Sequence, residues 1–476
     1  MAKFSSINPS NNEVLGSVKI ATKLEVEEAV KTARLGFLKW KTVPLAKRAK
    51  ILLKVSQLMK KEAPRLGKLI AQEMGKPLVE AVDEAQASSE TVKWFALKGS
   101  QYLEDEPIGP KKTNISSVIH YEPRGVVAAI KPWNFPVDTP MLAIAPALLA
   151  GNSVVFKPSE YVPLVSEELV KLMWQAGIPQ DVLLLLQGRG QVGVMLVDSP
   201  IDMVSFTGST QVGQEIAKKC SPRLIKYVLE LGGSSAAIVC QDADLDLAVN
   251  AIVWGRFSNN GQVCNAIKRV FVENSVADKL IKKLEDKIRE LRVGDPLDKK
   301  TDVGPLVSEK QLKSFEHQVT RGVIQSGRIT VGGRRLRDEP YAKGFFHEPT
   351  LMIHVTNKME VMQEEVFGPM LPVCRVESLK EAIKAANDSK YGLTAAVFTN
   401  SKIKAKEIMA ELEVGSVYVN DVSVLPAEAP WCGLKQSGVG VEGGKFGIWE
   451  FVHKKHWHLN MSTAKNRDYW FPYGKQ

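Results

Sequence analysis

The feature that most constrains the fold is an alternation of short apolar segments with helix-like segments, which begins after Pro123. Apolar runs of strand length, each ending in a loop, are separated by segments with the length and pattern of helices. Strands that are apolar throughout and alternate with helices predict a parallel sheet covered by helices on both faces. Such a sheet binds ligands at the carboxyl ends of its strands. The runs are "GVVAAIKPWNFP", "NSVVFKPSE", "VLLLLQG" and "DMVSFTGS".

A second alternation of the same kind extends from Leu231 to about Pro430, through "AAIVCQDADLD", "RVFVEN" and "AAVFTN". Because 476 residues are too many for one ordinary core, we predict an α/β fold with two α/β domains. Amphipathic helices are predicted over residues 24–74 and 79–99. Residues 104–122 form a predicted extended arm and residues 448–460 a predicted strand, and both are candidates for oligomer contacts.

The composition excludes several classes of protein. The net charge is +10, but Lys and Arg are interspersed with Glu and Asp, and no nucleic-acid-binding motif is present. The most apolar stretch, residues 140–156, is interrupted by Pro146, Gly151 and Asn152, so no membrane span is predicted. Five widely spaced cysteines favour free thiols in a reducing compartment, and the start has no apolar signal region. We therefore expect a cytoplasmic protein without nucleic-acid or membrane partners.

A literal G-x-G-x-x-G at Gly188, Gly190 and Gly193 has the spelling of a dinucleotide-binding fingerprint. That fingerprint requires an acidic residue at the end of the next strand, and the next strand ends in Phe206 and Thr207 instead. A tight turn that lets a helix pack closely on a strand is at least as good an interpretation.

Two other turns offer better chemistry for a dinucleotide. In "FTGSTQVG", Gly208 and Ser209 open a helix whose free N–H groups and dipole favour a phosphate, although Ser209 also suits a plain N-cap. In "VVFKPSE", Lys157 and Glu160 can bind ribose hydroxyls, although an ordinary surface ion pair is the alternative. Two complementary half-sites in one parallel sheet favour a dinucleotide.

Cys264 lies in "NNGQVCNAIKR", at a predicted loop-to-helix junction. Backbone donors at such a junction lower the pKa of a thiol and make it nucleophilic, whereas an isolated cysteine is by default a small buried hydrophobe. No histidine accompanies it in a local motif, so the sequence gives no support for a protease-like Cys–His pair.

Two further residues have side chains suited to catalysis. Glu230 stands between Leu229 and Leu231, and apolar surroundings raise a carboxyl pKa toward that of a general base; an exposed edge-strand position is the alternative. Asn134, in "KPWNFP", carries an amide that can donate to an oxyanion or simply satisfy a turn.

Taken together, these motifs resemble the aldehyde dehydrogenase superfamily along nearly the whole chain. The resemblance rests on "PWNFP", "KPSE", "FTGSTQVG", "LELGG", "NNGQVC" and "EEVFGP", which occur in the order found in that family. It implies a dinucleotide-binding domain of residues 1–103 and 123–230 and a catalytic domain of residues 231–430. It also implies a small β bridging and oligomerisation element of residues 104–122 and 431–476, including the C-terminal tail, in a homodimer or homotetramer.

The resemblance also assigns the cofactor and the chemistry. NAD is favoured because Glu160 repels a 2′-phosphate, and NADP stays possible. Cys264 is implied as the nucleophile, Asn134 as a donor to the oxyanion and Glu230 as the base that hydrolyses the thioester, with no metal. The implied cofactor-binding residues are Trp133, Lys157, Glu160, Gly208, Ser209, Glu365 and Phe367.

The substrate is less constrained by the resemblance. Ser234 after "ELGG" is similar to a succinate-semialdehyde dehydrogenase branch, but the implied tunnel residues are apolar and include no arginine for a substrate carboxylate. Succinate semialdehyde and other aliphatic or aromatic aldehydes are therefore all candidates. The implied tunnel is lined by Phe135, Leu142, Val263, Leu425 and Trp431.

Three rival hypotheses stay open. A CoA-acylating or reductive aldehyde dehydrogenase is opposed by Glu230, which such relatives tend to lack. A cysteine esterase or hydrolase is opposed by the double nucleotide signature. A non-catalytic nucleotide-binding protein gives no reason for Cys264, Glu230 and Asn134 to occur together.

Overall fold

The structure is a computed structural model that describes residues 2–109, 114–463, 465–467, 469–471 and 473. Its first sheet has the strand order β19-β9-β8-β5-β6-β7, and β5 to β9 run parallel, whereas β19 is antiparallel to β9. Central strands β5, β6 and β8 are almost wholly buried because their residues are apolar on both faces. The strands are β5 (Val126–Ile130), β6 (Ser153–Lys157), β7 (Leu183–Leu185), β8 (Met203–Thr207), β9 (Lys226–Glu230) and β19 (Gly438–Val439).

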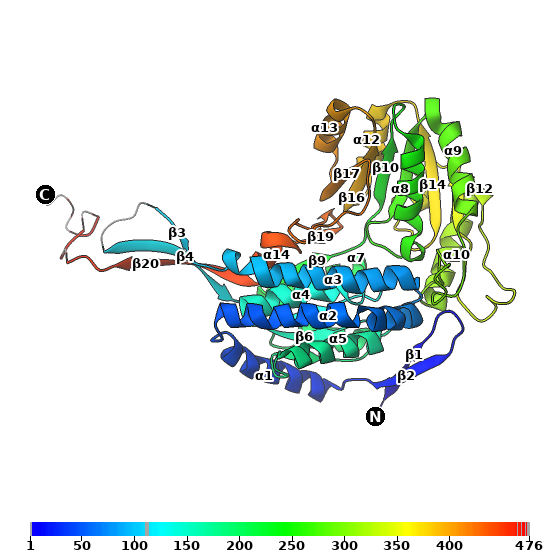
Figure 1. Ribbon diagram of the computed structural model, residues 1–476. Coiled ribbons are helices and arrows are strands. Elements are labelled where there is room, and N and C mark those ends of the chain that lie inside the picture. Colours follow the sequence, from blue (N-terminus) through cyan, green and yellow to red (C-terminus); the bar gives the residue numbers. More distant parts are fainter. Residues whose placement is uncertain (1, 110–113, 464, 468, 472, 474–476) are drawn as a thin grey trace.

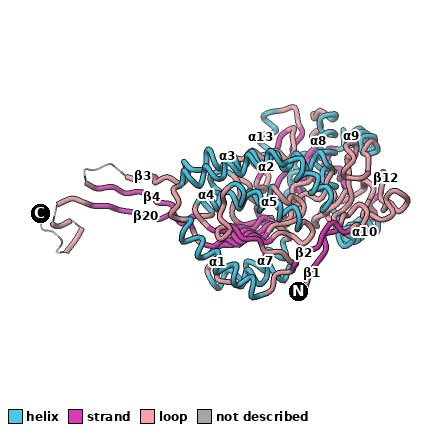
Figure 2. Tube along the Cα trace, turned by 60° about the horizontal axis from the view of Figure 1, so that its bottom comes forward, coloured by secondary structure: helices cyan, strands magenta, loops and turns pink. Residues whose placement is uncertain are grey.

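Helices cover both faces of this sheet (Figure 2). One face packs on the long helices α2 to α5, and the other on α1, α6 and α7. The two alternating sets of strand side chains thus enter two separate cores, which makes the register unambiguous. The helices are α1 (Lys23–Trp40), α2 (Leu45–Met74), α3 (Leu78–Lys98), α4 (Asp138–Ala150), α5 (Pro163–Ala176), α6 (Gly190–Asp198) and α7 (Thr210–Cys220), with 3-10 turns η1 (Gly99–Tyr102) and η2 (Ser221–Arg223).

The second sheet has the order β12-β13-β14-β11-β10-β16-β17, parallel except for β12. In Figure 1 this sheet, coloured green to orange, stands above helices α2 and α3. Its strands are β10 (Ser235–Val239), β11 (Ile267–Glu273), β12 (Arg328–Val331), β13 (Thr350–Ile353), β14 (Met370–Val376), β16 (Thr394–Phe398) and β17 (Ser416–Val419). Its helices are α8 (Leu245–Phe257), η3 (Ser258–Gly261), α9 (Asn274–Arg289), α10 (Glu309–Ile324), α11 (Glu360–Gln363), α12 (Leu379–Asn387) and α13 (Lys402–Glu411).

A third, antiparallel sheet projects from the body as an arm (Figure 1). Strand β20 (Val452–Asn460) pairs along β4 (Ile115–Pro123), which also pairs with β3 (Glu106–Pro107). These observations confirm the α/β fold class with two mainly parallel sheets and a small β element. The N-terminal hairpin of β1 (Lys3–Ile7) and β2 (Val14–Lys19) forms a separate two-stranded sheet. Within the described ranges, no helix is long and apolar enough to cross a membrane.

The structure differs from the sequence prediction at two places near the C-terminus. Residues 448–450 end helix α14 (Gly444–Glu450), so the predicted strand begins only at Val452. Residues 431–451 do not join the arm: β18 (Leu434–Lys435) pairs with β15 (Tyr391–Gly392), and β19 pairs with β9 of the first sheet. This segment therefore crosses between the two large sheets.

Candidate active site

Cys264 lies in the turn between η3 and β11, so the predicted loop-to-helix junction is wrong. The preceding turn is irregular, because Asn259, Asn260 and Gly261 all have positive φ, at 49°, 55° and 69°. A Cβ on Gly261 would lie 2.5 Å from the carbonyl oxygen of Gly368, so the turn can pack against that loop only with glycine.

Burial is the dominant influence on the Cys264 thiol. It raises the pKa of Cys264 to about 12, with smaller increases from Glu365 and Glu230. Lys268 lowers the pKa, and the Asn265 N–H lowers it further by a smaller amount. A backbone donor therefore lowers the pKa of the thiol as expected, but burial outweighs it, and the turn offers no helix N-terminus to add to the effect.

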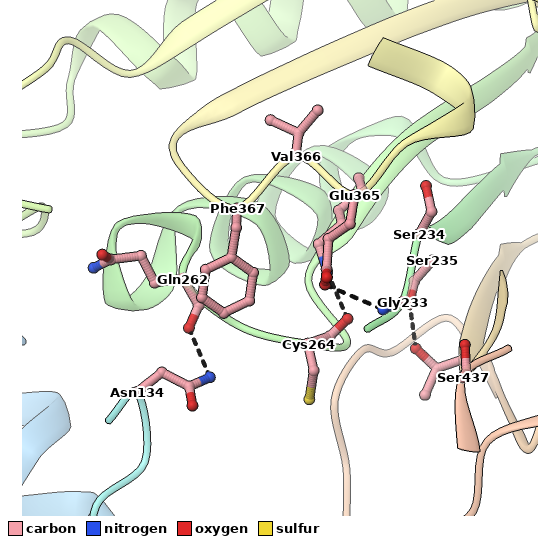
Figure 3. A network of polar contacts seen from close by, with 12 residues as sticks. Asn134, Gly233, Ser234, Ser235, Gln262, Cys264, Glu365, Val366, Phe367 and Ser437 are labelled. Atoms are coloured by element: carbon pink, nitrogen blue, oxygen red, sulfur yellow. Dashed lines mark hydrogen bonds and ion pairs between the residues drawn. The ribbon is translucent and has the colours of Figure 1, made fainter. Parts of the chain in front are cut away.

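Asn134 follows β5 and is buried beside the same turn. Its side-chain Nδ2 donates to the main-chain carbonyl oxygen of Gln262 at 3.0 Å. The main-chain carbonyl oxygen of Asn134 accepts from Asn259 Nδ2, also at 3.0 Å. Figure 3 shows the Cys264 sulfur on the same side of the turn as this amide, pointing away from Glu365. The amide is held by the chain that carries the sulfur, as an oxyanion donor needs to be.

Glu230 ends β9 and is 2% exposed. Burial raises its pKa well above the usual value, Glu442 raises it further, and Lys131 and the Trp431 indole oppose the increase. Neither carboxylate oxygen makes a hydrogen bond of normal geometry within the described residues. The exposed edge-strand alternative is excluded, and the site holds a desolvated carboxyl group.

A buried ion pair that the sequence prediction missed lies beside Glu230. Lys131 Nζ donates to Glu442 Oε1 at 2.6 Å and to Thr207 Oγ1 at 3.0 Å, and Ser205 also donates to Glu442 Oε1, at 3.2 Å. Lys131 directly follows the apolar strand β5 and precedes "PWNFP". A lysine at this place in the sequence could have been predicted as a site residue. Glu442 carries no such signal, because only the crossing segment brings it here.

One cavity of about 350 Å³ is lined by two of the three candidate reacting groups. Cys264, Glu230 and all five predicted tunnel residues line it, together with Trp254. Asn134 is not among the lining residues. The sequence prediction missed an acidic wall of this cavity, which consists of Glu80, Asp83, Glu84 and Asp138.

The predicted ribose-binding pair lies at the carboxyl end of β6. Lys157 is 4% exposed, its Nζ lies 3.8 Å from Glu160 Oε2, and burial lowers its pKa. An ammonium group and a carboxylate at the end of a parallel strand are the donor and acceptor that a ribose diol needs. The arrangement fits a dinucleotide.

The predicted phosphate-binding turn lies two strands away, after β8. Ser209 caps α7, because its Oγ accepts the Val212 N–H at 3.4 Å. The Gly208 N–H is already bonded to the Glu230 carbonyl at 3.0 Å, so a phosphate would meet the first-turn N–H groups of α7 and not that of Gly208. A Cβ on Gly208 would lie 2.5 Å from the Phe206 ring, which explains the glycine.

The G-x-G-x-x-G turn follows the edge strand β7 and leads into α6. A Cβ on Gly188 would lie 2.4 Å from Val192 Cγ2, and Val192 is fully buried. Close packing of the turn against the first residues of α6 therefore accounts for Gly188.

The other predicted cofactor residues come from both large sheets. The Trp133 ring meets the Phe367 ring edge to face, with centroids 5.6 Å apart. Glu365 Oε1 accepts the Gly233 N–H at 3.1 Å and the Lys268 ammonium at 2.9 Å (Figure 3 shows the Glu365 and Gly233 side of this network). No group of three or more His, Cys, Asp or Glu residues that could hold a metal occurs in the described part of the chain.

Comparison with known proteins gives consistent matches over nearly the whole chain. The aldehyde dehydrogenase family model matches residues 1–457. A betaine aldehyde dehydrogenase of Bacillus subtilis is 36% identical over 464 residues, which cover 97% of this chain and 94% of that protein. Human retinaldehyde dehydrogenase 3 is 36% identical over 460 residues, which cover 95% and 89%.

Solved structures agree. Betaine aldehyde dehydrogenase of Staphylococcus aureus in complex with NAD+ matches with a TM-score of 0.93 at 34% identity, covering 98% of this chain and 93% of that one. A 3,6-anhydro-L-galactose dehydrogenase in complex with NAP matches with a TM-score of 0.93 at 36% identity, covering 96% of each. With the family model, the relatives and the fold in agreement, the chain belongs to the aldehyde dehydrogenase family.

Proposed function

We propose that Cys264, Glu230 and Asn134 carry out the reaction of this family, the NAD(P)-dependent oxidation of an aldehyde to its carboxylic acid, on a positively charged aldehyde. The family reaction follows from membership. The observation that carries the assignment of residues is the shared cavity, which Cys264 and Glu230 line together.

The residues divide the chemistry as follows. The Cys264 thiolate attacks the aldehyde carbon, forming a C–S bond, and the carbonyl electron pair moves to the oxygen, which accepts from the Asn134 amide and the Cys264 N–H. When bound, the nicotinamide supplies the acceptor for the hydride that leaves this carbon. Glu230 then removes a proton from water, the hydroxide attacks the thioester carbon, and the Cys264 thiolate leaves.

The cofactor is NAD, with NADP also compatible, in line with related structures that hold NAD+ and NAP. We propose that Lys157 and Glu160 hold the ribose, that Ser209 and the first turn of α7 hold the pyrophosphate, and that Trp133, Glu365 and Phe367 hold the nicotinamide end. Glu160 repels a 2′-phosphate, which favours NAD. Gly208 contributes space and not a donor.

The substrate class follows from the charge of the cavity. In addition to Glu230 and Glu442, the four carboxylates of the acidic wall line this cavity. Lys76 is the one cation among the described lining residues. Lys76 is buried against Glu84, which accepts from its ammonium group, and lies over the Phe135 ring. Three carboxyl groups stay without a cationic partner there, so the lining attracts a cation, and Trp254, Trp431 and Phe135 provide aromatic surface for it.

Betaine aldehyde, the substrate named for two of the relatives above, carries such a quaternary ammonium group. Succinate semialdehyde is the second candidate, because Ser234 in "ELGGS" resembles the branch that oxidises it. Its carboxylate would meet the acidic wall, which makes it the weaker candidate.

The test is the formation of reduced cofactor with a panel of aldehydes: betaine aldehyde, an aminoaldehyde, a neutral aliphatic, an aromatic and succinate semialdehyde. We expect kcat/KM to be highest for the cations, by about tenfold or more over the neutral aldehydes, a ratio that corresponds to about 1.4 kcal/mol. Cys264→Ala should abolish turnover and keep NAD binding, and retained turnover would remove Cys264 as nucleophile. Dependence on added CoA would indicate an acylating enzyme, and acid formation without reduced cofactor would indicate a hydrolase.

A charge variant with a matched control tests the acidic wall. Asp83→Asn removes an exposed carboxylate of the cavity, and we expect it to raise KM for the cations selectively. Glu90 lies on the same helix but is paired with Lys60 and Lys93 outside the cavity. Glu90→Gln should therefore leave KM unchanged for the cationic and for the neutral aldehydes. Equal KM values for Asp83→Asn and the unaltered protein with every aldehyde would exclude the cationic substrate.

We further propose that residues 1–103 and 123–230 act as the dinucleotide-binding domain and residues 231–430 as the catalytic domain. Residues 104–122 and 452–460 would then be the oligomerisation arm of a homodimer or homotetramer. A cytoplasmic location is proposed from the unpaired cysteines, which suit a reducing compartment.

A further inference from the structure

Lys268 is a fully buried cation between the two loops of the candidate site. It is the second residue of β11, and its Nζ donates to the Cys264 carbonyl oxygen at 2.6 Å and to Glu365 Oε1 at 2.9 Å. The same ammonium group lies 5.6 Å from the centroid of the Phe367 ring. One side chain thus joins the turn of the proposed nucleophile to the proposed nicotinamide-binding loop.

A buried ammonium group at this place is expensive to desolvate and needs its partners. Burial lowers the pKa of Lys268, and the Glu365 carboxylate opposes that change most strongly. Glu365 is held in turn by the Gly233 N–H. Arg256 is a second buried cation near this network. It donates to the carbonyl oxygens of Val366 and Gly368 and so fixes the main chain of the loop that carries Glu365.

We propose that Lys268 is a positioning residue for the reaction: it clamps the Cys264 main chain to Glu365 and provides the fixed positive charge beside which the thiolate forms. The inference rests on the proposed function, since it takes Cys264 as the nucleophile. A thiolate in a buried site needs a compensating charge, and no histidine is among the described residues that line this cavity.

The charged groups that influence the Cys264 thiol have opposing effects on its ionisation. Lys268 favours the thiolate, whereas the carboxylates of Glu365 and Glu230 disfavour it. Tyr418 also interacts electrostatically with the thiol and stays neutral, because burial raises its pKa to about 12. Lys268 is therefore the one cation among these neighbours, and Glu365 partly cancels its charge.

The test measures the rate at which iodoacetamide alkylates Cys264 as a function of pH, without cofactor. Mass spectrometry of the Cys264 peptide separates it from Cys220, Cys240, Cys374 and Cys432. Lys268→Met should raise the apparent pKa of alkylation by about one unit, in the range typical for loss of a neighbouring opposite charge. Glu365→Gln should lower it, because it leaves the Lys268 charge uncancelled, and Lys268→Arg should stay close to the unaltered protein.

The control is Lys390→Met, which removes an exposed lysine paired with Glu364 next to Glu365. Its alkylation profile and turnover should match those of the unaltered protein. Coincident profiles for folded Lys268→Met and the unaltered protein would overturn the proposal. If Lys268→Met does not fold, the profile of Glu365→Gln decides, and an unshifted profile there overturns the proposal. Retained turnover in Cys264→Ala would instead refute the proposed function itself.

Discussion

Desolvation governs the ionisable side chains of the site. It raises the pKa of both the Cys264 thiol and the Glu230 carboxyl and so favours their neutral forms. Lys268 and Lys131, each buried and each bonded to a carboxylate, are the cations that oppose it. Catalysis in such a site depends on which charges enter with the substrate and the cofactor.

Glu230→Gln should separate the two halves of the reaction. The raised pKa of Glu230 means that the base form accumulates only as the pH rises through that value, so turnover of the unaltered protein should rise with pH. The variant should keep a burst of reduced cofactor and lose about 10²- to 10⁴-fold in steady-state turnover, the usual contribution of a general base. Rapid-mixing measurements check both, and a lost burst would assign Glu230 to the first half.

The acidic wall predicts a pH dependence of KM. Burial raises the pKa of Glu80 to about 7 and that of Asp138 to about 6. Both become negative as the pH rises through these values, so KM for a cationic aldehyde should fall between about pH 5 and about pH 8. KM for a neutral aldehyde measured in parallel should stay constant, and parallel changes in the two would refute the charge argument.

Individual elements were predictable where a pattern is local. The strands of the first sheet and most helices follow from apolar periodicity, and the ribose pair and the α7 turn follow from their place after strands. Strand β11 was harder, because its second and third residues are the cations Lys268 and Arg269, both buried. Their partners, Glu365 and the carbonyl oxygens of Ser234, Ala385 and Ala386, are distant in sequence, so no local signal shows that the charges are satisfied.

The two glycine-containing turns predict different effects of substitution on cofactor binding. Gly188→Ala should destabilise the protein by about 1–3 kcal/mol, because the new Cβ meets the buried Val192, and should leave KM for NAD unchanged. Ser209→Ala should cost about 0.5–2 kcal/mol as a lost cap and should raise KM for NAD. Thermal unfolding and cofactor titration distinguish the two, and a KM effect confined to Gly188→Ala would restore the literal fingerprint.

At the scale of the whole molecule, the arm leaves apolar side chains exposed. Trp457 and Leu459 on β20 and Met461 beyond it are 43%, 57% and 66% exposed. Such side chains on a projecting sheet support the proposed contact with another copy of the chain. The sequence predicted the arm from its extended pattern but could not show that residues 431–451 belong to the body.

Leu459→Lys tests the arm, because a charge at an apolar contact weakens association. We expect light scattering to show a lower molar mass for this variant. Leu224→Lys is the matched control, since Leu224 is 93% exposed and does not belong to the arm strands. An unchanged mass for Leu459→Lys would place the contact elsewhere.

The crossing segment has a consequence for biosynthesis. Strand β9 cannot gain its neighbour β19 until more than 200 residues later in the chain have left the ribosome, and β4 waits for β20 still longer. The whole of the second sheet is synthesised in this interval, while two strand edges stay open to solvent or to other chains. A nascent chain that stops before residue 438 should therefore expose those edges and aggregate. The fold is completed only when the last translated strands pair with β9 and β4.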